Sequence, residues 1–168
     1  LRLVDPYLDL RDPTWSEPVK LMFNVLHHAR NSDEHPIVEL HTSIDREFRG
    51  REAPTRTSVA ESDEVNRLVA ECERQLLRWL PVGQAATVVV WKQKRTDTPG
   101  FQYLHNRYFL TELGGILVGH GTDVTGYGTD DLAPLSPEQA SSRWLQFDAG
   151  SAAHQELARK VIQRAPAP

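Results

Sequence analysis

The segment from residue 105 to residue 122 carries side chain types that bind and attack a phosphate group. It reads His-x-Arg-x4-Glu from His105 through Arg107 to Glu112, and after six further residues it reads Gly-His-Gly-Thr from Gly119 to Thr122. An imidazole can act as a nucleophile or carry a proton, a guanidinium offers a planar fork of N–H donors, and a hydroxyl donates one more hydrogen bond. These residue types indicate a site for a phosphate or a similar anion.

The spacing predicts that these groups converge. Positions two apart on a strand share a face, so the histidine and the arginine point the same way. We expect strands at 101–113 and 116–118, turned by the two glycines between them. The hairpin then brings backbone N–H groups of Gly119 and Gly121 and the hydroxyl of Thr122 to the same anion. The alternative is an ordinary hairpin whose histidine and arginine are merely solvated.

The segment resembles the signature of the phospholipase D superfamily, His-x-Lys-x4-Asp-x6-Gly-Ser-x-Asn. Every spacing matches, and His105 and Gly119 are identical to the signature. The remaining positions differ in residue type: Arg107 replaces lysine, Glu112 replaces aspartate, His120 replaces serine and Thr122 replaces asparagine. The resemblance makes these the candidate catalytic residues: His105, Arg107, Glu112, His120 and Thr122.

The resemblance also implies roles. In the family the histidine is the nucleophile and forms a phosphohistidine, which corresponds to His105 here. The lysine and the asparagine hold the non-bridging oxygens, which corresponds to Arg107 and Thr122. A second motif supplies the histidine that protonates the leaving group. This chain shows no internal repeat, so catalysis would require two copies of His105 across a dimer axis, or His120 as the acid.

A narrower resemblance covers about residues 1–123. The order of elements here is similar to that in the C-terminal phospholipase D-like domain of the eukaryotic MIT-domain protein of cell abscission. That order is a strand ending in Asp-Pro-Tyr, an apolar helix, the strand at 37–40, the helix at 68–80 and the His-Asn-Arg at 105–107. Its motif runs His-Asp-Arg, a Gly-Trp turn and Gly-x-Gly-x-Asp. That domain is regarded as catalytically degenerate and binds acidic phospholipid head groups, which implies a binding role for this chain.

An arginine-rich stretch from 46 to 56 has no hydrophobic period and is expected to be a loop. It follows the strand that ends at His41, and ligands of open α/β sheets gather at the carboxyl ends of strands. Arg46 and Arg49 are therefore candidate phosphate ligands, with a solvated loop as the alternative. His41 itself is expected to be a satisfied polar residue at the strand end.

Three functions from different classes fit this pattern. The first, which we expect, is a phosphate-recognising, degenerate phospholipase D-like domain of a larger protein, which binds a phosphodiester, a phospholipid head group or nucleic acid at His105 and Arg107. The second is a homodimeric, metal-independent phosphodiesterase or nuclease with His105 as nucleophile. The third is a protein-interaction domain in which the long loop after Gly119 docks a partner and no phosphate binds.

The composition limits the class of protein. A chain of 168 residues is long enough for one domain with its own core, expected at 1–164 with a frayed linker at 165–168, and its start within a strand indicates a piece of a longer protein. The net charge of −4 argues against a protein that coats nucleic acid. The lone Cys72, expected on the buried face of a helix, and the lack of metal-ligand spacing predict no disulfide, no metal and no cofactor. No apolar run approaches a membrane span, so we expect a cytoplasmic protein, peripheral to a membrane if it binds lipid.

Hydrophobic periodicity predicts the elements that position the motif. Helices are expected at 16–30 with Ser16 as N-cap, at 58–80, and at 151–164. Strands are expected at 1–4, 37–41, 87–94, 101–113, 116–118 and 143–147, and a long loop at 119–142. Strands that alternate with helices predict an α/β fold, a phospholipase D-like mixed sheet flanked by helices.

Overall fold

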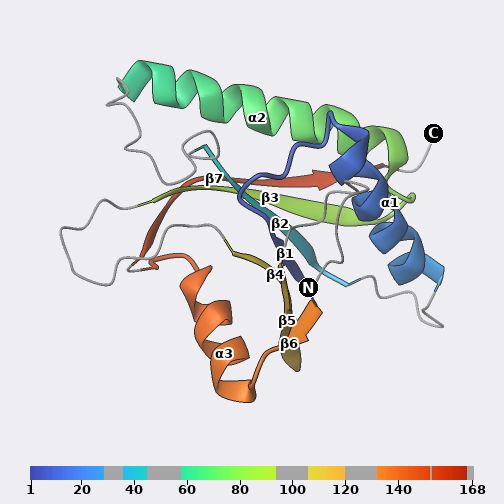
Figure 1. Ribbon diagram of the computed structural model, residues 1–168. Coiled ribbons are helices and arrows are strands. Elements are labelled where there is room, and N and C mark those ends of the chain that lie inside the picture. The colour runs from blue at the N-terminus through green and yellow to red at the C-terminus, as the bar shows by residue number, and fades with distance from the viewer. Residues whose placement is uncertain (29–35, 45–57, 94–105, 120–131, 152, 166–168) are drawn as a thin grey trace.

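The computed structural model describes residues 1–28, 36–44, 58–93, 106–119, 132–151 and 153–165. Seven strands form one mixed sheet in the order β6-β5-β4-β1-β2-β3-β7 (Figure 1). The strands are β1 (Arg2–Val4), β2 (Val38–Ser43), β3 (Ala85–Gln93), β4 (Arg107–Thr111), β5 (Gly114–Val118), β6 (Leu132–Pro134) and β7 (His154–Gln163). The central strands β1, β2 and β3 are parallel, and the outer strands pair antiparallel.

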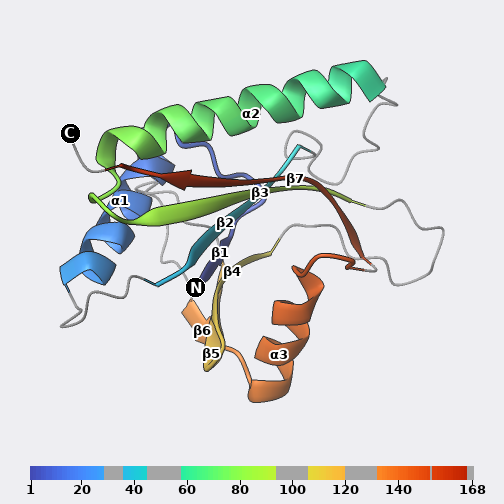
Figure 2. The same cartoon turned by 180° about the vertical axis from the view of Figure 1, so that it is seen from behind.

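Helices cover both faces of this sheet. The helices α1 (Pro13–His28) and α2 (Ser58–Trp79) lie on one face, and α3 (Pro137–Gln146) lies on the other, as the two opposite views show (Figures 1 and 2). A large buried cluster, which includes Phe23, Leu40 and Leu76, fills the space under α1 and α2. A smaller one around Trp91 and Phe147 lies on the side of α3. The predicted α/β fold with a mixed sheet flanked by helices is therefore confirmed.

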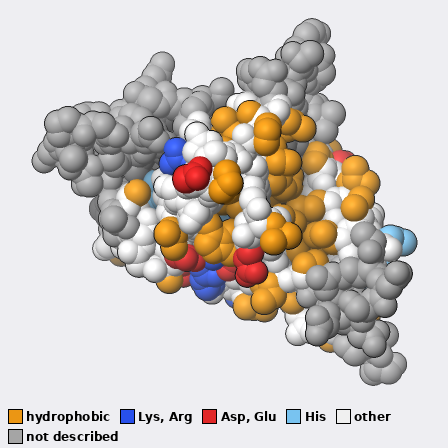
Figure 3. All heavy atoms as spheres, turned by 90° about the horizontal axis from the view of Figure 1, so that it is seen from below, with side chains coloured by type: hydrophobic (Ala, Val, Ile, Leu, Met, Phe, Trp, Pro, Cys, Tyr) orange, Lys and Arg blue, Asp and Glu red, His pale blue; other side chains and the backbone are white. Residues whose placement is uncertain are grey.

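Part of the sheet surface remains apolar and exposed. Seen from below, hydrophobic side chains gather over much of the molecule (Figure 3). The exposed hydrophobic residues of β5, β6 and the turn before β5 are Leu113, Ile116 and Leu132. None of the helices in the described ranges is long and apolar enough to cross a membrane.

The first helix begins earlier than the sequence predicts. Ser16 is expected to be the N-cap, but it is buried inside α1, which starts at Pro13. The Asp12 carboxylate accepts hydrogen bonds from the Thr14 backbone N–H and hydroxyl, at 2.9 and 2.8 Å. The Asp12 carboxylate therefore satisfies one of the free N–H donors of the helix start, and Pro13 is tolerated because a first helical residue needs no N–H donor.

The hairpin that carries the motif turns at a different place. Gly114 and Gly115 are expected to form the turn, but they lie in β5 and pair with Thr111 and Leu110 of β4. The turn consists of residues 112 and 113. Close packing favours glycine at position 115, since a Cβ there would lie 2.7 Å from Leu110 Cδ2 and 3.2 Å from a backbone carbonyl.

The C-terminal third differs most from the prediction. The expected loop at 119–142 contains β6 and most of α3, and the expected strand at 143–147 is the last turn of α3 with its C-cap. The expected helix at 151–164 is the edge strand β7. Its hydrophobic residues do not alternate with a period of two because the pairing with β3 shifts at a bulge beside Trp91. The interrupted alternation is what makes this strand resemble a helix in sequence.

Candidate anion site at the carboxyl ends of the parallel strands

Several strand ends meet at one edge of the sheet. The parallel strands β1, β2 and β3 finish there at Val4, Ser43 and Gln93. Strand β4 runs antiparallel to β1, so its first residue, Arg107, lies at this edge. Strand β5 returns to the same point, with Val118 opposite Arg107. Open α/β sheets bind ligands at the carboxyl ends of their strands, so this edge is where the fold would position a site.

Arg107 is the cationic residue of the motif that the structure describes, and it lies at this edge. The residue is 8% exposed. Its Nε lies 3.4 Å from Oδ1 of Asp5, and its Nη1 donates a long hydrogen bond of 3.5 Å to the Gly119 carbonyl. The guanidinium carbon lies 4.9 Å from the centre of the Tyr7 ring, in a cation–π contact. Within the described ranges no acceptor completes a hydrogen bond with Nε.

Arg2 shows what a fully paired guanidinium looks like in this fold. It is buried to the same extent, at 8% exposed. Its three nitrogens donate to Glu39 at 2.6 Å, to the Trp144 carbonyl at 2.7 Å and to Asp148 at 2.5 Å. Burying a charged group costs free energy unless its hydrogen bonds are made. Compared with Arg2, the guanidinium of Arg107 makes fewer and longer contacts with acceptors among the described residues.

Asp5 is the acidic partner at the same edge, and it is fully buried. It directly follows β1, and its Oδ1 accepts a hydrogen bond of 2.9 Å from the Tyr7 backbone N–H. Its Oδ2 accepts one of 3.3 Å from Trp15 Nε1 on α1. Neither Asp5 nor Tyr7 is among the site residues that the sequence predicts. The signal that points to Asp5 is an acidic side chain directly after an apolar strand.

The structure brings together only some of the predicted site residues. Gly119 lies beside Arg107, as the hairpin predicts. Glu112 does not, because it occupies the exposed turn at the opposite end of β4. The other candidates lie outside the described residues: His105, His120, Gly121, Thr122, Arg46 and Arg49.

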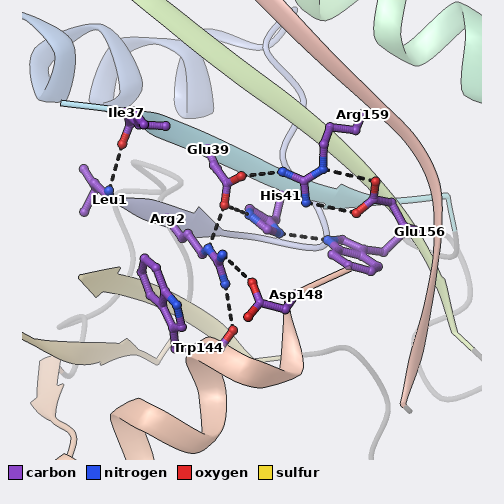
Figure 4. A network of polar contacts seen from close by, with 10 residues as sticks. Leu1, Arg2, Ile37, Glu39, His41, Trp144, Asp148, Glu156 and Arg159 are labelled. Atoms are coloured by element: carbon purple, nitrogen blue, oxygen red, sulfur yellow. Dashed lines mark hydrogen bonds and ion pairs between the residues drawn. The ribbon is translucent and has the colours of Figure 1, made fainter. Parts of the chain in front are cut away.

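A second polar cluster contains His41 and lies on the side of the sheet that α3 covers (Figure 4). The His41 side chain is fully buried, and its Nδ1 accepts a hydrogen bond of 2.9 Å from Trp91 Nε1. Its Nε2 lies 3.3 Å from Glu39, which also contacts Arg2 and Arg159. Because Nδ1 must accept, the proton of the imidazole is on Nε2 and the ring is neutral.

The pKa values of both His41 and Glu39 are lowered, and for different physical reasons. Burial lowers the pKa of His41 below its ordinary value of 6.5, since the cation would lose its hydration. The hydrogen bond from His41, together with Arg159 and Arg2, lowers the pKa of Glu39 to about 2. The cluster ties β1, β2, β7 and the residues after α3 together, so its role is structural.

No group of three or more His, Cys, Asp or Glu side chains in the described part of the chain could hold a metal ion. No protein-family model, curated protein or solved structure matches the chain significantly.

Proposed function

We propose that this chain is a phosphate-recognising domain of the degenerate phospholipase D-like type, which binds a phosphodiester or a phospholipid head group at Arg107. One observation carries the proposal: a buried guanidinium lies where the parallel strands end, and among the described residues its contacts to acceptors are long, at 3.4 and 3.5 Å. Buried cations with unused donors call for a bound anion or water. Arginine binds phosphate through two parallel hydrogen bonds, which supplies the missing acceptors.

The pairing of β4 with β5 supports the same proposal. Val118 lies opposite Arg107, and the Gly119 carbonyl contacts the guanidinium. The basic residue and the glycine of the motif, twelve positions apart in sequence, are therefore neighbours. The resemblance to the superfamily requires such proximity. His105 precedes Arg107 by two residues and belongs to the proposed site through the motif alone.

Recognition fits the residues better than catalysis does. Arginine in place of lysine keeps the charge and presents a planar fork, which favours stable capture of an anion. The asparagine that holds a phosphate oxygen in the family is Thr122 here. A shorter side chain with a hydroxyl donor therefore replaces the amide donor at that position. A lipid head group as ligand would place the domain at the surface of a membrane.

A binding experiment tests the proposal. Dimethyl phosphate is titrated into the protein and followed by the ³¹P NMR line width, and vesicles with and without an acidic phospholipid are tested for co-sedimentation. The wild type should bind, and Arg107→Gln should weaken binding by about tenfold or more, because a charge-assisted bidentate contact is lost. Arg107→Lys should bind with intermediate affinity, since an ammonium cannot form the fork.

The matched control is Arg143→Gln, because Arg143 also stacks on a tyrosine, with its guanidinium carbon 5.6 Å from the Tyr108 ring, and is not part of the proposed site. This variant should bind as the wild type does. Equal binding by Arg107→Gln, with unchanged thermal unfolding, would contradict the proposal. Hydrolysis of bis(p-nitrophenyl) phosphate in EDTA that disappears in His105→Ala would instead establish a histidine-dependent, metal-independent phosphodiesterase.

A further inference from the structure

We propose that Asp5 positions Arg107 and limits the charge of the anion that Arg107 accepts. The inference rests on the proposed function, because it concerns the same site. It starts from the observation that a fully buried carboxylate is in contact with the guanidinium expected to bind phosphate.

The positioning role follows from what the two oxygens of Asp5 contact. Oδ1 accepts from the Tyr7 backbone N–H at 2.9 Å and lies 3.4 Å from Nε of Arg107. The same oxygen thus contacts both the start of the turn that carries the Tyr7 ring and the guanidinium that stacks on that ring. Because the guanidinium is planar and rigid, the ion pair near Nε and the contact of Nη1 with the Gly119 carbonyl together set the orientation of its plane.

Asp5 cannot turn away from this contact. Its Oδ2 accepts a hydrogen bond from Trp15 Nε1 at 3.3 Å, and Trp15 packs against the large core cluster on α1. The carboxylate is therefore held from two sides by a backbone N–H and an indole N–H. Such an arrangement pre-organises the guanidinium before any ligand arrives, which reduces the conformational entropy lost on binding.

The limit on charge follows from the ion pair itself. An anion that reaches Arg107 also meets the carboxylate of Asp5, which lies against the same guanidinium. A singly charged phosphodiester brings one negative charge to the pair, and a doubly charged phosphomonoester brings two. Repulsion from a buried carboxylate is stronger than in water, because the surrounding protein screens it poorly. The pair therefore disfavours the second charge.

The experiment compares two small ligands at pH 7.5. Dimethyl phosphate carries one negative charge, and methyl phosphate carries nearly two, since the second pKa of a phosphomonoester is about 6. Affinities are measured by ³¹P NMR titration, and the ratio of the two dissociation constants is the readout. The wild type should favour dimethyl phosphate. Asp5→Asn should shift the ratio by about tenfold toward methyl phosphate, the size expected for removing one screened like charge at close range.

The variant needs a matched background. An asparagine can still accept from the Tyr7 N–H, but its amide N–H₂ would oppose the indole N–H of Trp15. The comparison is therefore made between Trp15→Phe and the double variant Asp5→Asn/Trp15→Phe, which differ in the charge at position 5 and not in the contact with the indole. Thermal unfolding of both confirms that each is folded.

Each outcome decides the matter. An unchanged ratio in the double variant would overturn the role of Asp5 while leaving phosphate binding at Arg107 intact. A wild type that prefers methyl phosphate would overturn it without any variant, even if Asp5→Asn does not fold. A wild type that binds neither ligand would overturn the proposed function, and this inference with it.

Discussion

His41 links the side chains of Trp91 and Glu39 in the interior, and the position of its proton is fixed by geometry. Trp91 donates to Nδ1 and Glu39 accepts from Nε2, so both ring nitrogens are used by the neutral form. Protonating Nδ1 would set two donors against each other. His41 is therefore a satisfied polar residue, as the sequence predicts, but it lies inside β2 and not at the strand end, and its partner Trp91 comes from a distant position of the chain.

The stability of the protein should fall on the acid side of pH 6.5. Above that pH His41 is neutral whether the chain is folded or unfolded. Below it the unfolded chain takes up a proton that the folded chain accepts only at lower pH, because burial lowers the pKa of His41. Glu39 adds a second loss as the pH falls from 4.5 toward 2, since its pKa is lowered to about 2.

The test follows the free energy of unfolding in urea between pH 7.5 and pH 4.5. His41→Gln keeps an acceptor and a donor but cannot titrate, so its stability should decrease less steeply than that of the wild type. His27→Gln, at an exposed position of α1, should retain the wild-type slope. The same slope in His41→Gln and the wild type would refute the assignment.

The β4–β5 hairpin is the element that gives the candidate site its geometry, and two adjacent glycines test how tightly it packs. A Cβ at Gly115 would lie 2.7 Å from Leu110 Cδ2 and 3.0 Å from Leu135 Cδ1, whereas nothing lies within 4 Å of a Cβ at Gly114. Gly115→Ala should therefore lower the free energy of unfolding by about 1–3 kcal/mol, the usual cost of overpacking a buried contact. Gly114→Ala should change it little, and urea unfolding of both distinguishes the two. Equal effects would show that packing at Gly115 is loose.

Part of the fold could be predicted from the sequence, and the helices and strands show which part. The helix with Cys72 on its buried face, the central strands and the α/β class follow from hydrophobic periodicity and are confirmed. The helix α3 was missed, although Ser136 and Gln139 form a capping box after which it begins. Strand β7 was missed because its pairing with β3 decides its conformation and a bulge hides the alternation. Arg107 and Gly119 were placed correctly at one edge, but Asp5 comes from a distant strand that no local spacing reveals.

The whole molecule is organised by one sheet with a core cluster on each face. Trp15 and Trp79 pack against the larger cluster, and Trp91 and Trp144 belong to or pack against the smaller one. The shared strands should couple both layers in a single cooperative transition. In the variant Trp15→Phe/Trp79→Phe, tryptophan fluorescence reports the α3 side alone, and its urea midpoint should coincide with that of circular dichroism. Separate midpoints would show that the two layers unfold independently.

The two outer strands of the sheet differ in how they meet a neighbouring molecule. Strand β6 has three residues and ends at Pro134, which lacks an N–H donor. It therefore offers few backbone hydrogen-bonding groups to a strand of another molecule. Strand β7 has ten residues, and its exposed cations are ion-paired: Arg159 with Glu39 and Glu156, and Lys160 with Glu73. A second copy that paired along β7 would therefore have to rearrange these ion pairs. Salt weakens exposed ion pairs, so pairing of two copies through β7 should respond to ionic strength, whereas the short edge at β6 should not.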